Sequence, residues 1–121
     1  MNIESSTIRE NEKNYKVQEE DLSIDVSKEA VEEVLTRVPG VEKEEVIFLI
    51  ATVENSRLIE AESESARNHK LEVSTVVKGL VNLLQEYEPQ NLIEILEQIK
   101  YYEIERVFNS VKAAEELQEV L

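Results

Sequence analysis

The sequence predicts an all-α protein, a small helical bundle of about four helices preceded by a polar N-terminal arm. Glycine and proline occur only twice each in 121 residues, whereas a β-sandwich needs many turn-forming residues. Apolar residues recur every three or four positions from Ser27 onward, which is the spacing of amphipathic helices. Aromatic residues make up only 5% of the chain, so we expect a core of Val, Leu, Ile and Ala.

The length is that of one domain. We place a single helical domain at residues 22–121 and a polar flexible arm at residues 1–21, since chain termini are often mobile. Residues 22–26 alternate between apolar and polar side chains, which is typical of a short strand. No partner strand is evident nearby, so an extended segment lying on the core is the alternative.

The first helix is expected to begin after Ser27, whose hydroxyl can cap the free amides of the first turn. Pro39-Gly40 should end it. The second helix should begin near Glu42. Its uncharged run Val46–Val53 fits either a helix in the centre of the bundle or a buried strand. We favour the helix because the apolar spacing continues to Ala61 without a turn signal.

The third helix is expected from Leu71 to Tyr87. Gly79 lies inside it at a cost of about 1 kcal/mol relative to Ala, and a close helix crossing would explain that glycine. Pro89 should end this helix, because the residue before proline disfavours the α conformation. Asn91 then begins a capping-box pattern ahead of a last helix that starts at Leu92.

That last helix would extend nearly to the end of the sequence, about 45 Å at 1.5 Å per residue. A domain of this size does not need such a length. Either part of its apolar stripe meets another chain, or the helix breaks near Tyr101-Tyr102. We therefore expect an interface containing Tyr101, Tyr102, Val107 and Phe108, in which one tyrosine faces the core and the other the flank.

Cationic side chains gather around the expected tip of a helical hairpin and form a second candidate interface. This cluster contains Arg57, Arg67, His69 and Lys70. It could dock an acidic partner surface through Arg67 and Lys70. The alternative is a mixed-charge loop that only keeps the chain soluble.

The formal net charge is −14, from 27 acidic and 13 basic residues. Direct nucleic-acid binding is not expected, because affinity for phosphates comes mainly from Lys and Arg. Binding to anionic membranes is disfavoured for the same reason. The run Val46–Val53 is too short to span a bilayer, and Met1–Glu12 does not have the apolar region of a signal peptide. We therefore expect a cytoplasmic protein.

The chain contains no cysteine, which excludes disulfides, zinc–thiolate sites and thiol catalysis. His69 is the only histidine, and its polar neighbours indicate a solvated side chain. Glutamate pairs at helical spacing follow from the abundance of Glu, and no nucleotide-binding or zinc-peptidase motif is present. We expect no catalysis, no cofactor and no metal site.

Helix length and composition together predict a protein–protein interaction module, an adaptor or regulator that self-associates as a homodimer through helical apolar surface. The alternative is an acidic inhibitor that mimics nucleic acid and occupies the groove of a DNA- or RNA-binding protein. Salt dependence distinguishes them, since only the mimic should bind with a steep salt dependence.

Overall fold

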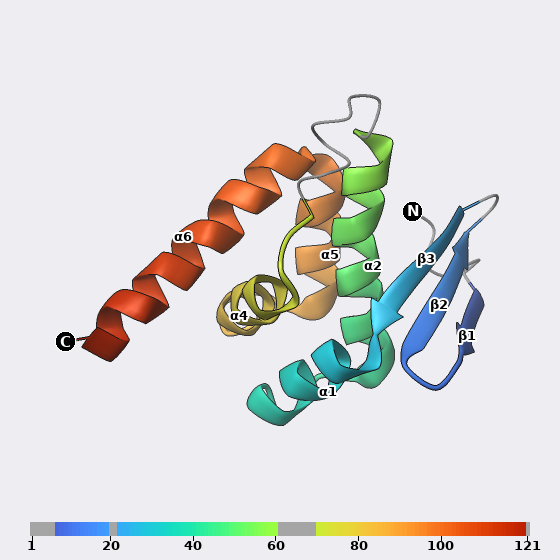
Figure 1. The fold of residues 1–121 in the computed structure, drawn as a ribbon, viewed down its shortest axis with the longest axis horizontal. Coiled ribbons are helices and arrows are strands. Elements are labelled where there is room, and N and C mark those ends of the chain that lie inside the picture. Colours follow the sequence, from blue (N-terminus) through green and yellow to red (C-terminus); the bar gives the residue numbers. More distant parts are fainter. Residues whose placement is uncertain (1–6, 20–21, 61–69, 121) are drawn as a thin grey trace.

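The fold is α+β, and the all-α prediction is wrong. The computed structural model describes residues 7–19, 22–60 and 70–120. In these ranges a three-stranded antiparallel sheet of order β1-β2-β3 precedes five helices (Figure 1). The elements are β1 (Thr7–Glu10), β2 (Asn14–Glu19), β3 (Leu22–Ser27), α1 (Lys28–Arg37), α2 (Lys43–Ile59), α4 (Val73–Leu83), α5 (Pro89–Gln98) and α6 (Tyr101–Val120).

The sheet includes much of the segment that we expected to be a polar arm. The extended stretch at residues 22–26 is a strand, and its partner is β2, which the sequence analysis missed. Val17 of β2 lies opposite Ile24 of β3, and both side chains are buried. On β2, Lys16 lies between the buried Tyr15 and Val17 and is exposed, because successive side chains of a strand point to opposite faces. Each strand thus offers few inward apolar residues, too few to stand out in a polar segment.

Helix α1 begins and ends where local signals predicted. The hydroxyl of Ser27 accepts a hydrogen bond of 3.3 Å from the backbone N–H of Ala30. The helix ends at Arg37, and Gly40 follows with a φ of 93°, a backbone conformation that glycine adopts without a steric cost.

Helix α2 is the centre of the molecule, as Figure 1 shows, with the sheet on one side and α5 on the other. The run Val46–Val53 is helical, and seven of its eight side chains are buried. The helical alternative for this run is therefore confirmed. At its start, the backbone N–H of Glu42 donates to Oε1 of Glu45 over 3.1 Å.

The C-terminal part is divided differently from the prediction. Helix α4 is shorter than expected, and α5 begins at Pro89 instead of Leu92. Proline fits the first helical position because its fixed φ suits the helix and its missing N–H would have no partner there. The expected long helix is broken at Ile99, which is extended, so the alternative of a break near Tyr101 is confirmed.

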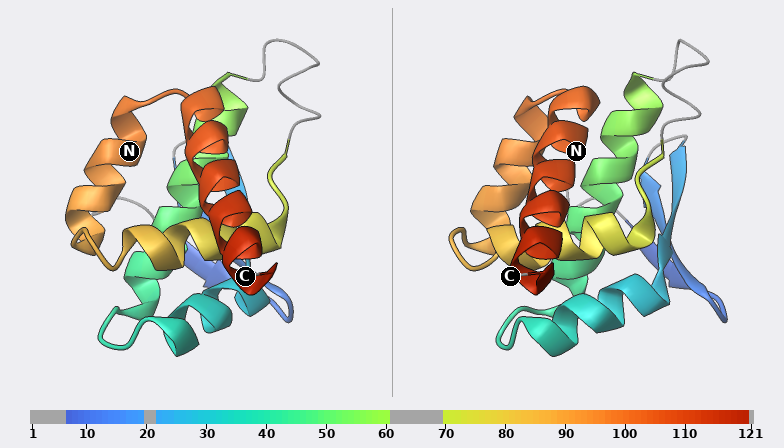
Figure 2. Two further views of the ribbon diagram at one scale, coloured as in Figure 1. Left: turned by 90° about the vertical axis from the view of Figure 1, so that its left-hand side faces the viewer. Right: turned by 60° about the vertical axis from the view of Figure 1, so that its left-hand side comes forward.

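Helices α4 and α6 cross closely at Gly79 (Figure 2). A Cβ atom added to Gly79 would lie 2.7 Å from Cγ of Phe108, so the crossing requires glycine, as expected. Beyond this crossing the C-terminal end of α6 extends away from α2 and the sheet (Figure 1). None of the described helices is long and apolar enough to cross a membrane.

Candidate interaction surface

The residues predicted to form an interface divide between core and surface. Tyr101 and Phe108 are buried, with 3% and 0% of their surface exposed, so neither is available to a partner in this fold. Tyr102 and Val107 are exposed by 56% and 38%. Lys70 is exposed ahead of α4, and Arg67 and His69 lie outside the described residues. The two adjacent tyrosines face opposite environments, as their angular separation on a helix predicts.

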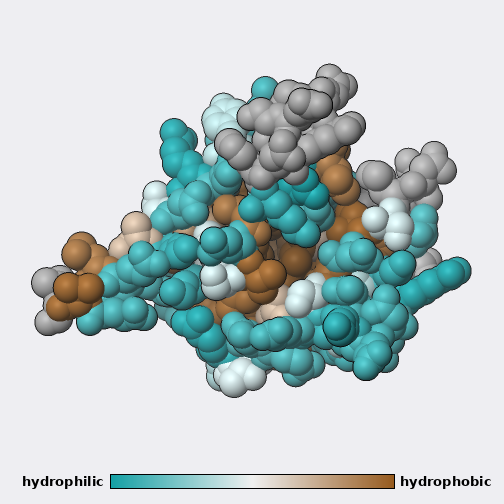
Figure 3. All heavy atoms as spheres, viewed as in Figure 1, coloured by the Kyte–Doolittle hydropathy of each residue, from teal (hydrophilic) through white to brown (hydrophobic). Residues whose placement is uncertain are grey.

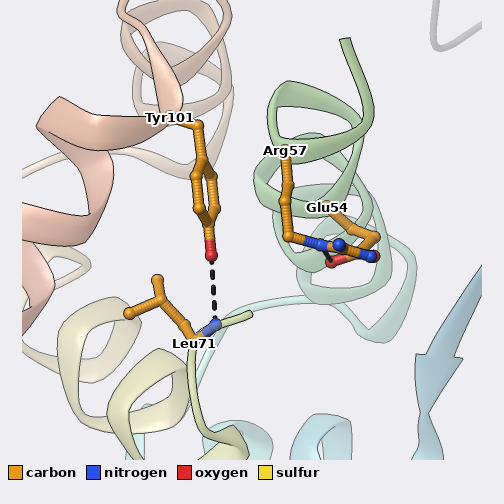
Figure 4. Close-up of polar contacts among 4 residues, drawn as sticks. All are labelled: Glu54, Arg57, Leu71 and Tyr101. Carbon is orange, nitrogen blue, oxygen red and sulfur yellow. Dashed lines mark hydrogen bonds and ion pairs between the residues drawn. The ribbon is translucent and has the colours of Figure 1, made fainter. Parts of the chain in front are cut away.

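Tyr101 is held by two long-range hydrogen bonds at the start of α6. Its hydroxyl oxygen accepts a hydrogen bond of 3.0 Å from the backbone N–H of Leu71 (Figure 4). Its own backbone N–H donates to Oε1 of Glu60 over 2.9 Å. The residue therefore joins the beginning of α6 to the end of α2 and to the segment before α4. Tyr101 therefore has a structural role, because it holds these three segments together.

Near this tyrosine, Arg57 forms an ion pair with Glu54 within α2. Its Nε donates to both carboxylate oxygens of Glu54, over 3.0 and 3.1 Å (Figure 4). This hydrogen bonding raises the pKa of Arg57 above its usual value. Both side chains are largely shielded from solvent, so Arg57 offers little charge to a partner.

We expect Tyr101→Phe to lower the free energy of unfolding by about 1 kcal/mol, because the Leu71 N–H loses its acceptor. Burial raises the pKa of the Tyr101 hydroxyl above 10.0. The folded state therefore favours the neutral phenol. The stability that this preference contributes is fully present below the pKa of the unfolded state and is lost as the pH rises through the pKa of the folded state. Urea unfolding at neutral pH and above pH 10 should show that the free energy of unfolding falls less with rising pH in the variant than in the wild type. An equal fall in both proteins would contradict this role of Tyr101.

A stripe of exposed residues lies on the side of α6 turned away from α4, and the last three of its members are apolar. Five exposed residues follow one another at intervals of four, three, four and three, the heptad spacing of a helix that pairs with another helix. Apolar atoms are visible at the C-terminal end of α6 in Figure 3. We name this stripe the outer face of α6; it consists of Arg106, Ser110, Ala113, Leu117 and Val120.

The outer face differs from the rest of this acidic chain in its charge. From Arg106 to Val120 it carries one cation and no carboxylate. The carboxylates between Arg106 and Val120 lie on the flanks of α6 or on the side toward α4. Leu117 and Val120 are exposed by 61% and 84%. At the centre of the stripe, Ser110 and Ala113 are small enough to let a second helix approach closely.

Tyr102 lies one turn before Arg106, in a shallow groove of about 500 Å³ between the end of α2 and the α5–α6 break. Ile59, exposed by 66%, lies in the same groove. Glu60 and Glu97 also line it, so its apolar surface is interrupted by carboxylates. Carboxylates therefore border this groove, whereas the outer face of α6 carries none.

Leu117 and Val120 are not among the interface residues predicted from the sequence. Their heptad spacing was a usable signal, but the side of α6 that faces the body depends on the contact with α4. Within the described ranges, no group of three acidic or histidine side chains is arranged to hold a metal ion. Comparison with known protein families, curated proteins and solved structures gives no match.

Proposed function

We propose that this chain is a protein–protein interaction module, an adaptor or regulator, that forms a homodimer through the outer face of α6. The observation that carries this proposal is an exposed heptad stripe free of carboxylates on a helix that extends from the body. Heptad spacing lets side chains of one helix insert between those of another. The stripe therefore fits a second α-helix.

Charge favours a second copy of this chain as the occupant. Two molecules that each carry a formal charge of −14 repel one another over most of their surfaces. Association between copies is then least opposed where carboxylates are absent, which is the outer face of α6. A basic partner would instead gain most from the surfaces that carry carboxylates.

We expect Leu117→Glu to weaken self-association about tenfold or more, because a carboxylate would be buried without a partner in the contact. Leu117 is exposed within one protomer, so folding should be unaffected. Sedimentation equilibrium should give the wild type twice its monomer mass of 14.0 kDa, and the variant the monomer mass. The matched control is Gln90→Glu, which adds the same charge at an exposed position in the first turn of α5.

Raising the salt concentration should leave the dimer unchanged or tighten it, because salt screens the repulsion between the two acidic chains. A wild-type protein that remains monomeric at micromolar concentrations would contradict the proposal. So would an equal weakening by Gln90→Glu. A monomer that binds a basic protein with a steep salt dependence would instead favour the nucleic-acid mimic.

A further inference from the structure

A small apolar cleft lies on the face shown in Figure 3, where apolar atoms are visible at the bottom of a hollow ringed by polar side chains. It is enclosed by parts of β3, α1, α2, α4 and the start of α6, and its volume is about 80 Å³. Aliphatic side chains of Ile50, Val53 and Val76 form its apolar lining, together with Leu71 and Val73. Several elements thus converge on an apolar hollow that also has a few polar groups at its edge.

The polar groups of the cleft carry both signs of charge. Glu54 is bound to Arg57, so its charge is already compensated. Asp25 and Lys70 also line the cleft, and both are exposed. In the described part of the chain neither of them makes an ion pair. One carboxylate and one ammonium group are thus available beside an aliphatic surface.

We propose that this cleft binds a small aliphatic zwitterion, of the class of free branched-chain α-amino acids. The branched side chain packs against Ile50, Val53 and Val76, the ligand's ammonium group pairs with Asp25, and its carboxylate pairs with Lys70. A simple amine or a simple carboxylic acid would match only one of the two charges. This binding is independent of the proposed self-association.

The size of the cleft limits the ligand's side chain. A cavity of about 150 Å³ in another protein holds a benzene molecule, and this cleft has about half of that volume. A branched aliphatic group of three or four carbon atoms fits this space better than an aromatic ring. Valine and leucine are therefore the probes, and glycine is the probe without a side chain.

The test is a methyl NMR titration of the full chain with L-valine and L-leucine. We expect saturable shifts of the methyl signals of Ile50, Val53 and Val76, with a Kd of about 1 mM. Isobutylamine, isovalerate and glycine, which each lack one of the three recognised groups, should bind at least about tenfold more weakly.

Two exposed substitutions test the charged contacts without disturbing the core. Asp25→Asn and Lys70→Gln should each weaken binding about tenfold, whereas Glu29→Gln, an exposed charge on α1 outside the cleft, should leave it unchanged. The Leu117→Glu variant should bind the amino acids like the wild type, which separates this result from the fate of the dimer. Absence of saturable shifts would overturn the proposal. So would equal binding of the three analogues, or unchanged binding in both charge variants.

Discussion

Replacing Phe108 with alanine should lower the free energy of unfolding by about 3–5 kcal/mol, the usual cost of removing a fully buried phenylalanine. The ring is completely shielded from solvent and lies against Gly79 at the crossing of α4 and α6. Because Gly79 has no side chain, it cannot fill the cavity that the ring would leave. Urea unfolding at one fixed protein concentration measures the loss, since a dimer would make stability depend on concentration.

The neighbouring residue on α6 provides the control for this substitution. Val107 is exposed by 38%, so Val107→Ala should change the free energy of unfolding by less than about 1 kcal/mol. A loss of similar size for both substitutions would mean that the ring of Phe108 is not at the packed crossing described above.

Gly79→Ala should also destabilise the fold, although alanine is the better helix former. Helix propensity favours alanine by about 1 kcal/mol, but the new Cβ would meet the ring of Phe108 at 2.7 Å from Cγ. Cγ is bonded directly to Cβ of Phe108, so it moves only if χ1 of Phe108 leaves its rotamer or if α6 shifts. Overpacking of this kind costs about 1–3 kcal/mol. We therefore expect a net loss of up to about 2 kcal/mol, measured by the same unfolding experiment.

The sign of this effect should reverse when the ring is absent. In a Phe108→Ala background, Gly79→Ala should be neutral or stabilising, because the clash is gone while the helix propensity remains. The double-mutant cycle then gives a coupling energy of about 1–3 kcal/mol between two residues in direct contact. Additive effects would show that Gly79 is tolerated in α4 and not required by the crossing.

Helix positions could be predicted well because their signals are local. The cap at Ser27, the stop at Pro39-Gly40 and the apolar run in α2 each act within a few residues. The boundary at Pro89 was wrong for an instructive reason. Proline is found both after the end of a helix and in its first turn. We predicted that Pro89 ends the third helix, whereas it is the first residue of α5.

The candidate surface could be predicted only in part. Periodicity correctly indicated that Tyr101 and Tyr102 face different environments, and it indicated more apolar surface on the last helix than the core needs. It did not indicate which side of α6 packs against the core. The buried face of α6 contains Ile104 and Phe108, and Gly79 leaves room for Phe108 against α4. Leu117 then lies on the opposite, exposed side.

By itself, the sequence determined the helical segments, the aliphatic core and the acidic surface of this protein, because those properties depend on composition and on neighbours along the chain. Only the tertiary structure decided that β2 pairs with both β1 and β3, which face of α6 is exposed, and that Asp25 and Lys70 share one cleft. The last two depend on residues far apart in the sequence, and the strand pairing depends on a few buried side chains such as Val17 and Ile24. All three are fixed by packing against a common core and not by local conformational preference.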